Sequence, residues 1–531
     1  MRTIYYHGEI VTMEKENDYQ EAFSVLDGII EAVRTNEEIL DLRQEEDKLI
    51  DLKGTVVFPG FIDGHSHFVG VANSLTQCIL SDANSFEDII FMMKDFIKEN
   101  NIAPGEWVCG SSYDHNFLIE KTHPTKEVLD RISVDHPVII VHASSHMGSV
   151  NSLALKVMHI DENTPDPKGG KYYRIENSME PNGHMEEQAF IVIQNAIPLP
   201  SREKLMKLII KAQDIYASYG ITTIQDGMVD KSLFELLKYA SSNQILHLDV
   251  VGYIDLNNCR NLLLENKHLT KQYWNHLKIG GYKIFLDGSP QGKTAWLSAP
   301  YVGEEEYCGY PSLSNEKLYK LIEESLIDEV QLLAHCNGDA AAEQYIEQFD
   351  KAIKRYEGKN IKRPVMIHAQ LVSKEQLKRM PALHMIPSFF IAHTYYWGDI
   401  HIKNLGLERA SRISPAYTAE ELHIPYTFHQ DSPVIQPDMM RTIWCAVNRK
   451  TRNGMSIGKE ERITVWQAMK AITINGAYQY FEEKRKGTIT PGKIADLVIL
   501  NKNPLCTEHD NIKDIVVLET IKDGITVYKK T

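Results

Sequence analysis

Short apolar segments recur along the middle of the chain, and each is a candidate β-strand. They span residues 56–65, 219–227, 245–254, 276–288, 328–339, 363–370, 384–393 and 424–432. Helical patterns follow most of them, for example at 232–242, 316–326, 340–356 and 465–481. Repeated strand–helix units whose strands are apolar on both faces are typical of a parallel sheet. Eight such units predict an α/β protein with a closed (β/α)8 TIM barrel.

The two ends of the chain have a different pattern. Residues 1–57 and 485–531 contain short strands separated by turns with glycine. Because neither end has enough strands for a stable sheet of its own, we expect the two ends to pair into one small β-sandwich. The alternative is a pair of separate hairpins at the edges of the main domain.

The barrel pattern, at 58–484, has one long interruption. Tyr219, in the second strand segment, follows His67 by 152 residues, far more than one strand–helix unit needs. The excess predicts an inserted subdomain at about 71–205. Insertions at the carboxyl-terminal face of a barrel commonly cover the active site, so we expect this one to cap it.

Composition narrows the function classes. In 531 residues, 43% are hydrophobic and 24% are charged, which is typical of a globular protein. A net charge of −15 disfavours nucleic acid as a partner. The seven cysteines contain no CxxC pair, which suits a reducing compartment. With no apolar stretch long enough to span a membrane and no apolar signal core, the sequence predicts a soluble cytoplasmic protein that does not act at membranes.

Residues able to bind a metal follow several of the strand segments. His65 and His67 form an H-x-H pair, and alternate residues of a strand point to the same side. His335, His368 and Asp431 end later segments, where barrel enzymes place catalytic groups. Each histidine alone would more often be a hydrogen-bonded core residue. The ordered set predicts a site for zinc or a similar divalent ion.

Lys283 lies within an apolar strand segment. A buried lysine is costly unless it is paired or loses its charge. A lowered pKa would leave a nucleophilic amine, which can take up carbon dioxide and become a carbamate. The alternative is an ion pair with Asp287 or with a glutamate on a neighbouring strand, and spacing alone favours that pairing.

Several motifs resemble those of the amidohydrolase superfamily. They are PGFIDGHSH at 59–67, a lysine on strand four, AHCNGD at 334–339, IHAQ at 367–370, HQDSP at 429–433 and GKIADLVIL at 492–500. DGSPQGKTAWLSAPY (287–301), SSHMGSVNSLAL (144–155) and HTYYWGD (393–399) resemble the family-3 branch, which includes N-substituted formamide deformylases. The resemblance covers nearly the whole chain and implies a TIM barrel with a β-sandwich from both chain ends.

The resemblance also implies roles for the metal-binding residues. His65 and His67 would hold the deeper metal, and a carboxylated Lys283 would bridge two metals. His335 and His368 would hold the second metal. Family members differ between one metal and two. Zinc is the default for this ligand set, with iron, manganese or cobalt as alternatives.

Asp431 would contact the metal and act as general base toward the metal-activated water. It would then pass the proton to the leaving nitrogen. The predicted function is therefore hydrolysis of a C–N bond in a small-molecule amide, N-acyl amine or N-formyl amine. A deaminase or a cyclic-amide hydrolase on the same scaffold is one alternative. A non-catalytic regulatory or ligand-binding protein is another.

Weaker candidates surround the predicted site. Each is individually more often structural than functional, and a homo-oligomer is left open. The substrate-binding candidates are His146, Asp287, Gln291, His393 and Trp397. Further candidates are Asp114, His115 and His142 in the insert, and His429, which faces the same side as Asp431.

Overall fold

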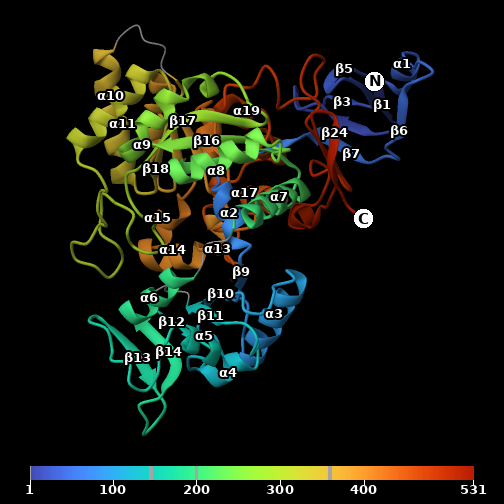
Figure 1. The fold of residues 1–531 in the computed structure, drawn as a ribbon. Helices are drawn as coiled ribbons and strands as arrows, with labels where there is room; N and C mark the ends of the chain where they lie inside the picture. Colours follow the sequence, from blue (N-terminus) through green and yellow to red (C-terminus); the bar gives the residue numbers. More distant parts are fainter. Residues whose placement is uncertain (1, 143–146, 198–200, 357–361) are drawn as a thin grey trace. The chain divides into compact units, whose positions relative to one another are not determined.

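Eight parallel strands form one continuous sheet in the computed structural model, which describes residues 2–142, 147–197, 201–356 and 362–531 (Figure 1). Neighbouring strands of the sheet follow one another in the chain. The strands are β8 (Phe61–Ile62), β15 (Ile221–Val229), β16 (Asp249–Asp255), β17 (Leu277–Phe285), β18 (Gln331–Cys336), β19 (Val365–His368), β20 (Ile386–Phe389) and β21 (Thr427–Phe428). Six of these strands lie within the apolar segments, β15 and β16 extend past the ends of theirs by two residues and one residue, and the predicted barrel class is confirmed.

The first and last strands of this sheet are joined by backbone hydrogen bonds. The Gly64 amide donates to the carbonyl of Phe428 at 3.1 Å, directly beyond β8 and β21. Farther along, the His67 amide donates to the carbonyl of Ser432 at 2.8 Å. The amide of Asp431 donates to the carbonyl of His65 at 3.3 Å. This seam closes the curled sheet and aligns the segments that follow β8 and β21.

Segment 56–65 is divided in the structure, although its apolar character predicts one barrel strand. Strand β7 (Val56–Pro59) pairs with the C-terminal strand β22 (Leu497–Leu500), and only β8 belongs to the barrel. Pro59 lacks the amide hydrogen that would continue the ladder. Gly60 then lies so close to Thr222 that a side chain at this position would clash with it. The chain therefore changes sheets at this Pro–Gly step.

Helices alternate with the barrel strands, as the periodicity predicts. Several begin at side-chain caps: Ser314 accepts a hydrogen bond from the Lys317 amide at the start of α10. The described helices include none with the length and apolar character of a membrane span. In and after the barrel the helices are α8 (Lys231–Ser242), α9 (Leu256–Glu265), α10 (Asn315–Asp328), α11 (Asp339–Arg355), α12 (Lys374–Leu377), α13 (His393–Tyr396), α14 (Gly398–Leu405), α15 (Leu407–Ser411), α16 (Ala416–Glu421), α17 (Met439–Asn448), α18 (Val465–Ala471) and α19 (Ile474–Gln479).

The chain ends build a β-sandwich, as predicted, and blue N-terminal strands lie beside red C-terminal strands in Figure 1. One sheet has the order β5-β4-β1-β6 and the other β24-β23-β22-β7-β2-β3. A shared core joins them, with Phe23 and Val25 from the first sheet and Val57, Leu497 and Ile521 from the second. The remaining strands are β1 (Arg2–Tyr6), β2 (Glu9–Val11), β3 (Tyr19–Gln20), β4 (Ala22–Leu26), β5 (Ile29–Arg34), β6 (Lys48–Asp51), β23 (Val517–Lys522) and β24 (Ile525–Lys529).

Residues 72–208 form a second compact unit, which overlaps the insert predicted at about 71–205. Its sheet has the order β13-β14-β12-β11-β10-β9. That this unit caps the active site stays a prediction. Its main elements are β9 (Gln77–Ile79), α3 (Phe86–Glu99), β10 (Val108–Tyr113), α4 (Lys126–Asp130), β11 (Val138–His142), β12 (Met147–Val150), α5 (Ser152–Val157), β13 (Gly170–Arg174), β14 (Pro181–Glu187) and α6 (Gln188–Ala196); α2 (Phe68–Ser74) and α7 (Arg202–Ser218) flank it.

A buried group of charges ties the barrel to the sandwich. Lys486 is 1% exposed and contacts Asp249, at the start of β16. Lys522, at the end of β23, lies 3.1 Å from carboxylate oxygens of both Asp249 and Asp496. Burial alone would raise the pKa of Asp249, but the two lysines outweigh it and hold that pKa well below its usual range. The pairing of these charges therefore makes their burial tolerable.

We expect Lys486→Met to destabilise the protein by about 3 kcal/mol, because Asp249 and Glu482 each lose a buried cationic partner. Lys522 and Lys278 remain beside them, so the buried group is left with an excess of negative charge. Urea unfolding followed by circular dichroism measures the change. Lys484→Met is the matched control, because Lys484 is exposed, and should stay within about 0.5 kcal/mol of wild type. Equal stability of the two variants would show that the buried network is dispensable.

Candidate metal centre

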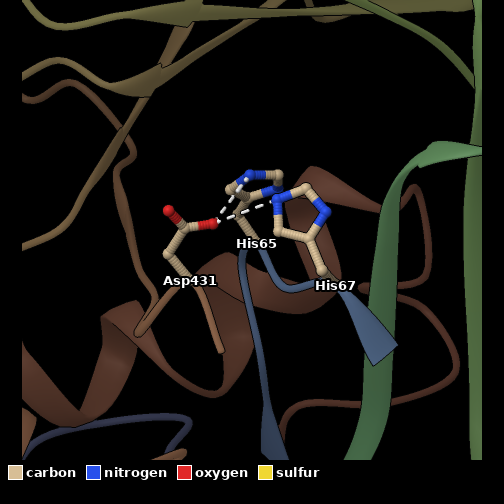
Figure 2. A group of neighbouring side chains, drawn as sticks. All are labelled: His65, His67 and Asp431. Carbon is tan, nitrogen blue, oxygen red and sulfur yellow. Dashed lines mark ion pairs between the residues drawn. The ribbon is translucent and has the colours of Figure 1, made fainter. Parts of the chain in front are cut away.

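His65 and His67 follow β8 directly, and both rings point at the same carboxylate (Figure 2). The Nε2 atoms of the two rings each lie 3.3 Å from Oδ1 of Asp431. The side chain of His65 is 1% exposed, whereas that of His67 is 31% exposed. The barrel seam thus brings a carboxylate from the end of the barrel against the H-x-H pair from its start.

In each ring, the acceptor that faces Nδ1 determines which nitrogen carries the proton. Nδ1 of His67 lies 2.8 Å from the carbonyl of Gly227, which can only accept, so Nδ1 is the protonated atom. Nδ1 of His65 lies 2.5 Å from Oε1 of Gln225. That amide is itself oriented, because its Nε2 donates to the carbonyl of Gly64 at 2.9 Å. Both histidines therefore present an unprotonated Nε2 to Asp431, the form that binds a metal.

The point at which the two Nε2 atoms and Oδ1 of Asp431 converge requires a positive charge. Oδ1 of Asp431 is shielded from solvent and has no hydrogen-bond donor within the described part of the chain. Burial would lower the pKa of His67, but contact with Asp431 outweighs it and raises that pKa. Burial would likewise raise the pKa of Asp431, yet contact with His67 holds it below its usual value. Without a cation a second proton on His67 would fill this role; two imidazoles and a carboxylate fit a divalent ion directly.

Lys283 lies on β17, fully buried, with its amine 3.2 Å from Nε2 of His65. Burial lowers the pKa of this amine to about 7. The ion pair with Asp287 that spacing favours is not found among the described residues. Both carboxylate oxygens of Asp287 instead accept from backbone amides, those of Asn337 at 2.9 Å and Gly338 at 2.7 Å. Lys283 therefore faces the candidate metal ligands.

His335 and His368 lie near the carboxyl ends of β18 and β19, with ring centroids 4.6 Å apart. Nε2 of His368 is 4.0 Å from Oδ2 of Asp431. Its Nδ1 lies 3.1 Å from Nε2 of His429, whose Nδ1 lies 2.9 Å from the Ser388 hydroxyl. Burial holds the pKa of His368 well below its usual range and lowers that of His429 to about 3. Both rings are therefore neutral at pH 7, and Nε2 of His368 is able to bind a cation.

The backbone is strained at two of these positions. His368 has φ 73° and Asp431 has φ 53°, both in the left-handed region that residues other than glycine rarely adopt. Such conformations persist only where the surrounding fold imposes them, and they concentrate at functional sites. The structure thus brings the six predicted ligands into one cluster; their roles stay predictions. The six are His65, His67, Lys283, His335, His368 and Asp431.

Of the predicted substrate-binding residues, His393 and Trp397 lie among aromatic rings, whereas Asp287 binds backbone amides. His393 and Trp397 pack on Phe390, with ring centroids 4.5 and 5.8 Å away, and Phe390 lies 5.4 Å from His429. The carboxylate of Asp287 holds the loop after β18 and lies 3.4 Å from Nδ1 of His335.

The two remaining substrate-binding candidates are Gln291 and His146. Oε1 of Gln291 is buried without a hydrogen-bond partner in the described structure, and its carbonyl accepts from Asn404 at 3.2 Å. His146 lies outside the described residues.

Gln225 and Asp226 are site residues that our reasoning from the sequence missed. Asp226 accepts a hydrogen bond from the Val69 amide at 3.1 Å, and burial raises its pKa to about 7. Gln225 is the central residue of β15, and both residues lie near the end of the apolar segment predicted at 219–227. Polar residues at the carboxyl end of a barrel strand are the signal that identified the other sites. Applied to this second strand, the same signal would have found them.

Comparisons with known proteins agree with a metal-binding site in this barrel. A profile described as the Amidohydrolase family matches residues 48–528. The chain is 28% identical to YtcJ of Bacillus subtilis (strain 168), over 100% of both chains. It is 23% identical to the N-substituted formamide deformylase of Arthrobacter pascens, over 99% of this chain and 98% of that one.

Solved structures share the fold. A crystal structure described as an uncharacterized metal-dependent hydrolase from Pyrococcus horikoshii OT3 matches with a TM-score of 0.78 at 23% identity. The match covers 96% of this chain and 99% of that one. At this identity the likeness establishes the common architecture, including the barrel that carries the cluster.

Gln225→Leu should weaken binding of Zn²⁺ by about 10–100-fold, because it removes the acceptor that orients His65. Isothermal titration of metal-free protein measures this affinity. Gln225→Glu retains an acceptor for Nδ1 and should bind within a few-fold of wild type. Gln344→Leu is the control for losing a buried amide, since Gln344 lies on α11 and donates to the carbonyl of Leu313. Unchanged affinity in Gln225→Leu would refute the proposed orientation of His65.

Proposed function

The chain belongs to the amidohydrolase family, and from that membership we propose that it is a metal-dependent hydrolase of C–N bonds. The proposed substrate is a small-molecule amide, N-acyl amine or N-formyl amine. One observation carries the proposal: two unprotonated imidazole nitrogens and a carboxylate oxygen without a donor converge within 3.3 Å in the barrel. Such an arrangement is unfavourable for a protein that binds no cation there.

One or two divalent cations, with zinc as the default, would be held by this cluster. His65, His67 and Asp431 would hold one, and His335 and His368 would hold the other if Lys283 is carboxylated. A bound cation supplies Lewis acidity, which lowers the pKa of water and stabilises negative charge on a carbonyl oxygen. A lysine amine with a pKa of about 7 is neutral often enough at physiological pH to attack carbon dioxide. That reaction forms an N–C bond and releases one proton.

Asp431 is the proposed general base. Its lowered pKa keeps it ionised at neutral pH, so it can accept a proton from the attacking water. The same carboxyl group can then deliver the proton to the leaving nitrogen. His368 and His67 lie on either side of this carboxylate, at 4.0 Å from Oδ2 and 3.3 Å from Oδ1. These contacts restrain the orientation of the carboxylate.

The aromatic group near the cluster favours an apolar substituent on the substrate. Phe390 packs against His429 on one side and against His393 and Trp397 on another. The relative named N-substituted formamide deformylase makes N-formyl amines the first class to screen. Free thiols at all seven cysteines accord with the proposed reducing, cytoplasmic setting.

Asp431→Asn should retain the fold and lose turnover by about 10²–10⁴-fold, because the amide cannot accept the proton. The assay follows release of free amine and of the carboxylic acid from a panel of N-formyl and N-acyl amines. Asp214→Asn is the matched control, because the Asp214 side chain is 58% exposed on α7, and it should turn over like wild type. Wild-type turnover by Asp431→Asn would contradict the assignment of the base.

The same assay separates the alternatives. Release of ammonia from a ring amine, with no carboxylic acid product from the panel, would favour a deaminase. Opening of a cyclic amide without loss of a fragment would favour a cyclic-amide hydrolase. Tight binding of a small molecule with no turnover in metal-loaded protein would favour a regulatory or ligand-binding role.

A further inference from the structure

A second group of metal-binding side chains lies in the unit formed by residues 72–208. Asp114 and His115 directly follow β10, and His142 is the last residue of β11. The two strands are parallel neighbours, and the register pairs Tyr113 with His142. Carboxyl ends of adjacent parallel strands are the usual ligand-binding edge of an α/β sheet. This sheet thus brings residues 28 positions apart, Asp114 and His142, to one edge.

The spacing of the three donor atoms is within about 0.2 Å of that expected for one face of a tetrahedron. Nδ1 of His115 lies 3.2 Å from Nε2 of His142. Oδ1 of Asp114 lies 3.5 Å from Nε2 of His142 and 3.8 Å from Nδ1 of His115. For bonds of about 2.0–2.2 Å to zinc, tetrahedral ligand atoms stand roughly 3.3–3.6 Å apart. A tetrahedral cation just above the centre of this triangle would need little movement of the side chains.

Neighbouring groups hold these ligands in place. The amide and the side-chain nitrogen of Asn116 both donate to Oδ1 of Asp114 at 2.9 Å. The ring of His115 lies 4.0 Å from that of His123, whose Nδ1 lies 3.0 Å from the Tyr113 hydroxyl. Hydrogen bonds and packing of this kind orient metal ligands in known sites.

The far side of His123 is also packed. It stacks on His184 with centroids 4.0 Å apart and ring planes 12° from parallel. This contact restrains the His123 ring against which His115 packs.

We propose that Asp114, His115 and His142 form a second site, which binds a divalent transition-metal cation such as Zn²⁺. Two imidazoles with a carboxylate favour zinc, nickel, cobalt or copper over magnesium or calcium. The side chains of Asp114 and His115 are 26% and 28% exposed, which gives an ion access from solvent and leaves room for water as a fourth ligand. The inference is independent of the function proposed for the barrel.

The test counts bound zinc in full-length, tag-free protein. Metal-free protein is equilibrated with buffered Zn²⁺, and the equivalents per chain are measured by elemental mass spectrometry. His115→Ala and Asp114→Asn are the test variants; both side chains are partly exposed, so the fold should survive. His159→Asn is the control, because His159 is exposed in the same unit and its φ of 55° suits asparagine.

We expect His115→Ala to lose one equivalent of zinc, and Asp114→Asn to bind that equivalent at least about tenfold more weakly. His159→Asn should match wild type, and the barrel-bound zinc should remain in every variant. Equal stoichiometry and affinity in wild type and both test variants would overturn the proposal, and would mean that His115 and His142 share a proton. An equal loss in His159→Asn would overturn it as well.

Discussion

Closure of the barrel between its first and last strands is the constraint on which the candidate site depends. The seam hydrogen bonds run between residues more than 360 positions apart, from Gly64 to Phe428 and from His65 to Asp431. They fix the carboxylate of Asp431 against both rings of the H-x-H pair. No local sequence preference could achieve this, because the two segments meet only when all intervening strands are in register.

Function and stability are divided between the two ends of the barrel, as is usual for this architecture. At the carboxyl ends of the strands, burial keeps His368 neutral and lowers the pKa of Lys283, so uncharged nitrogens are available to bind a cation. At the opposite end, burial is offset by direct pairing, as between Lys486 and Asp249. Burial thus leaves uncharged metal-binding groups at one end of the barrel. At the other end, ion pairs compensate for the burial of charge and anchor the β-sandwich.

Much of this arrangement could be predicted from the sequence, because buried parallel strands are continuously apolar and therefore visible in the pattern. The ordered ligands were visible for the same reason, since each follows such a strand. The division of segment 56–65 was not predicted, because a strand that leaves one buried sheet and a strand that enters another are equally apolar. The helix expected at 465–481 is interrupted at Thr473, whose φ of −127° and ψ of −97° are not helical.

Other features depend on contacts between distant elements. The role of Gln225 follows only from its distance to His65, and the proton positions follow from which carbonyls the rings meet. Asp114 and His142 are individually unremarkable polar residues of the insert. They become a candidate site only through the register of β10 and β11.

Anomalous diffraction at the zinc absorption edge is the most direct test of the central claim. Crystals would be grown from tag-free protein purified without chelator and reconstituted with Zn²⁺. The account predicts an anomalous peak about 2.0–2.2 Å from Nε2 of His65, Nε2 of His67 and a carboxylate oxygen of Asp431. A fully reconstituted crystal with no peak at this point, and with His67 bonded directly to Asp431 through a proton, would contradict it.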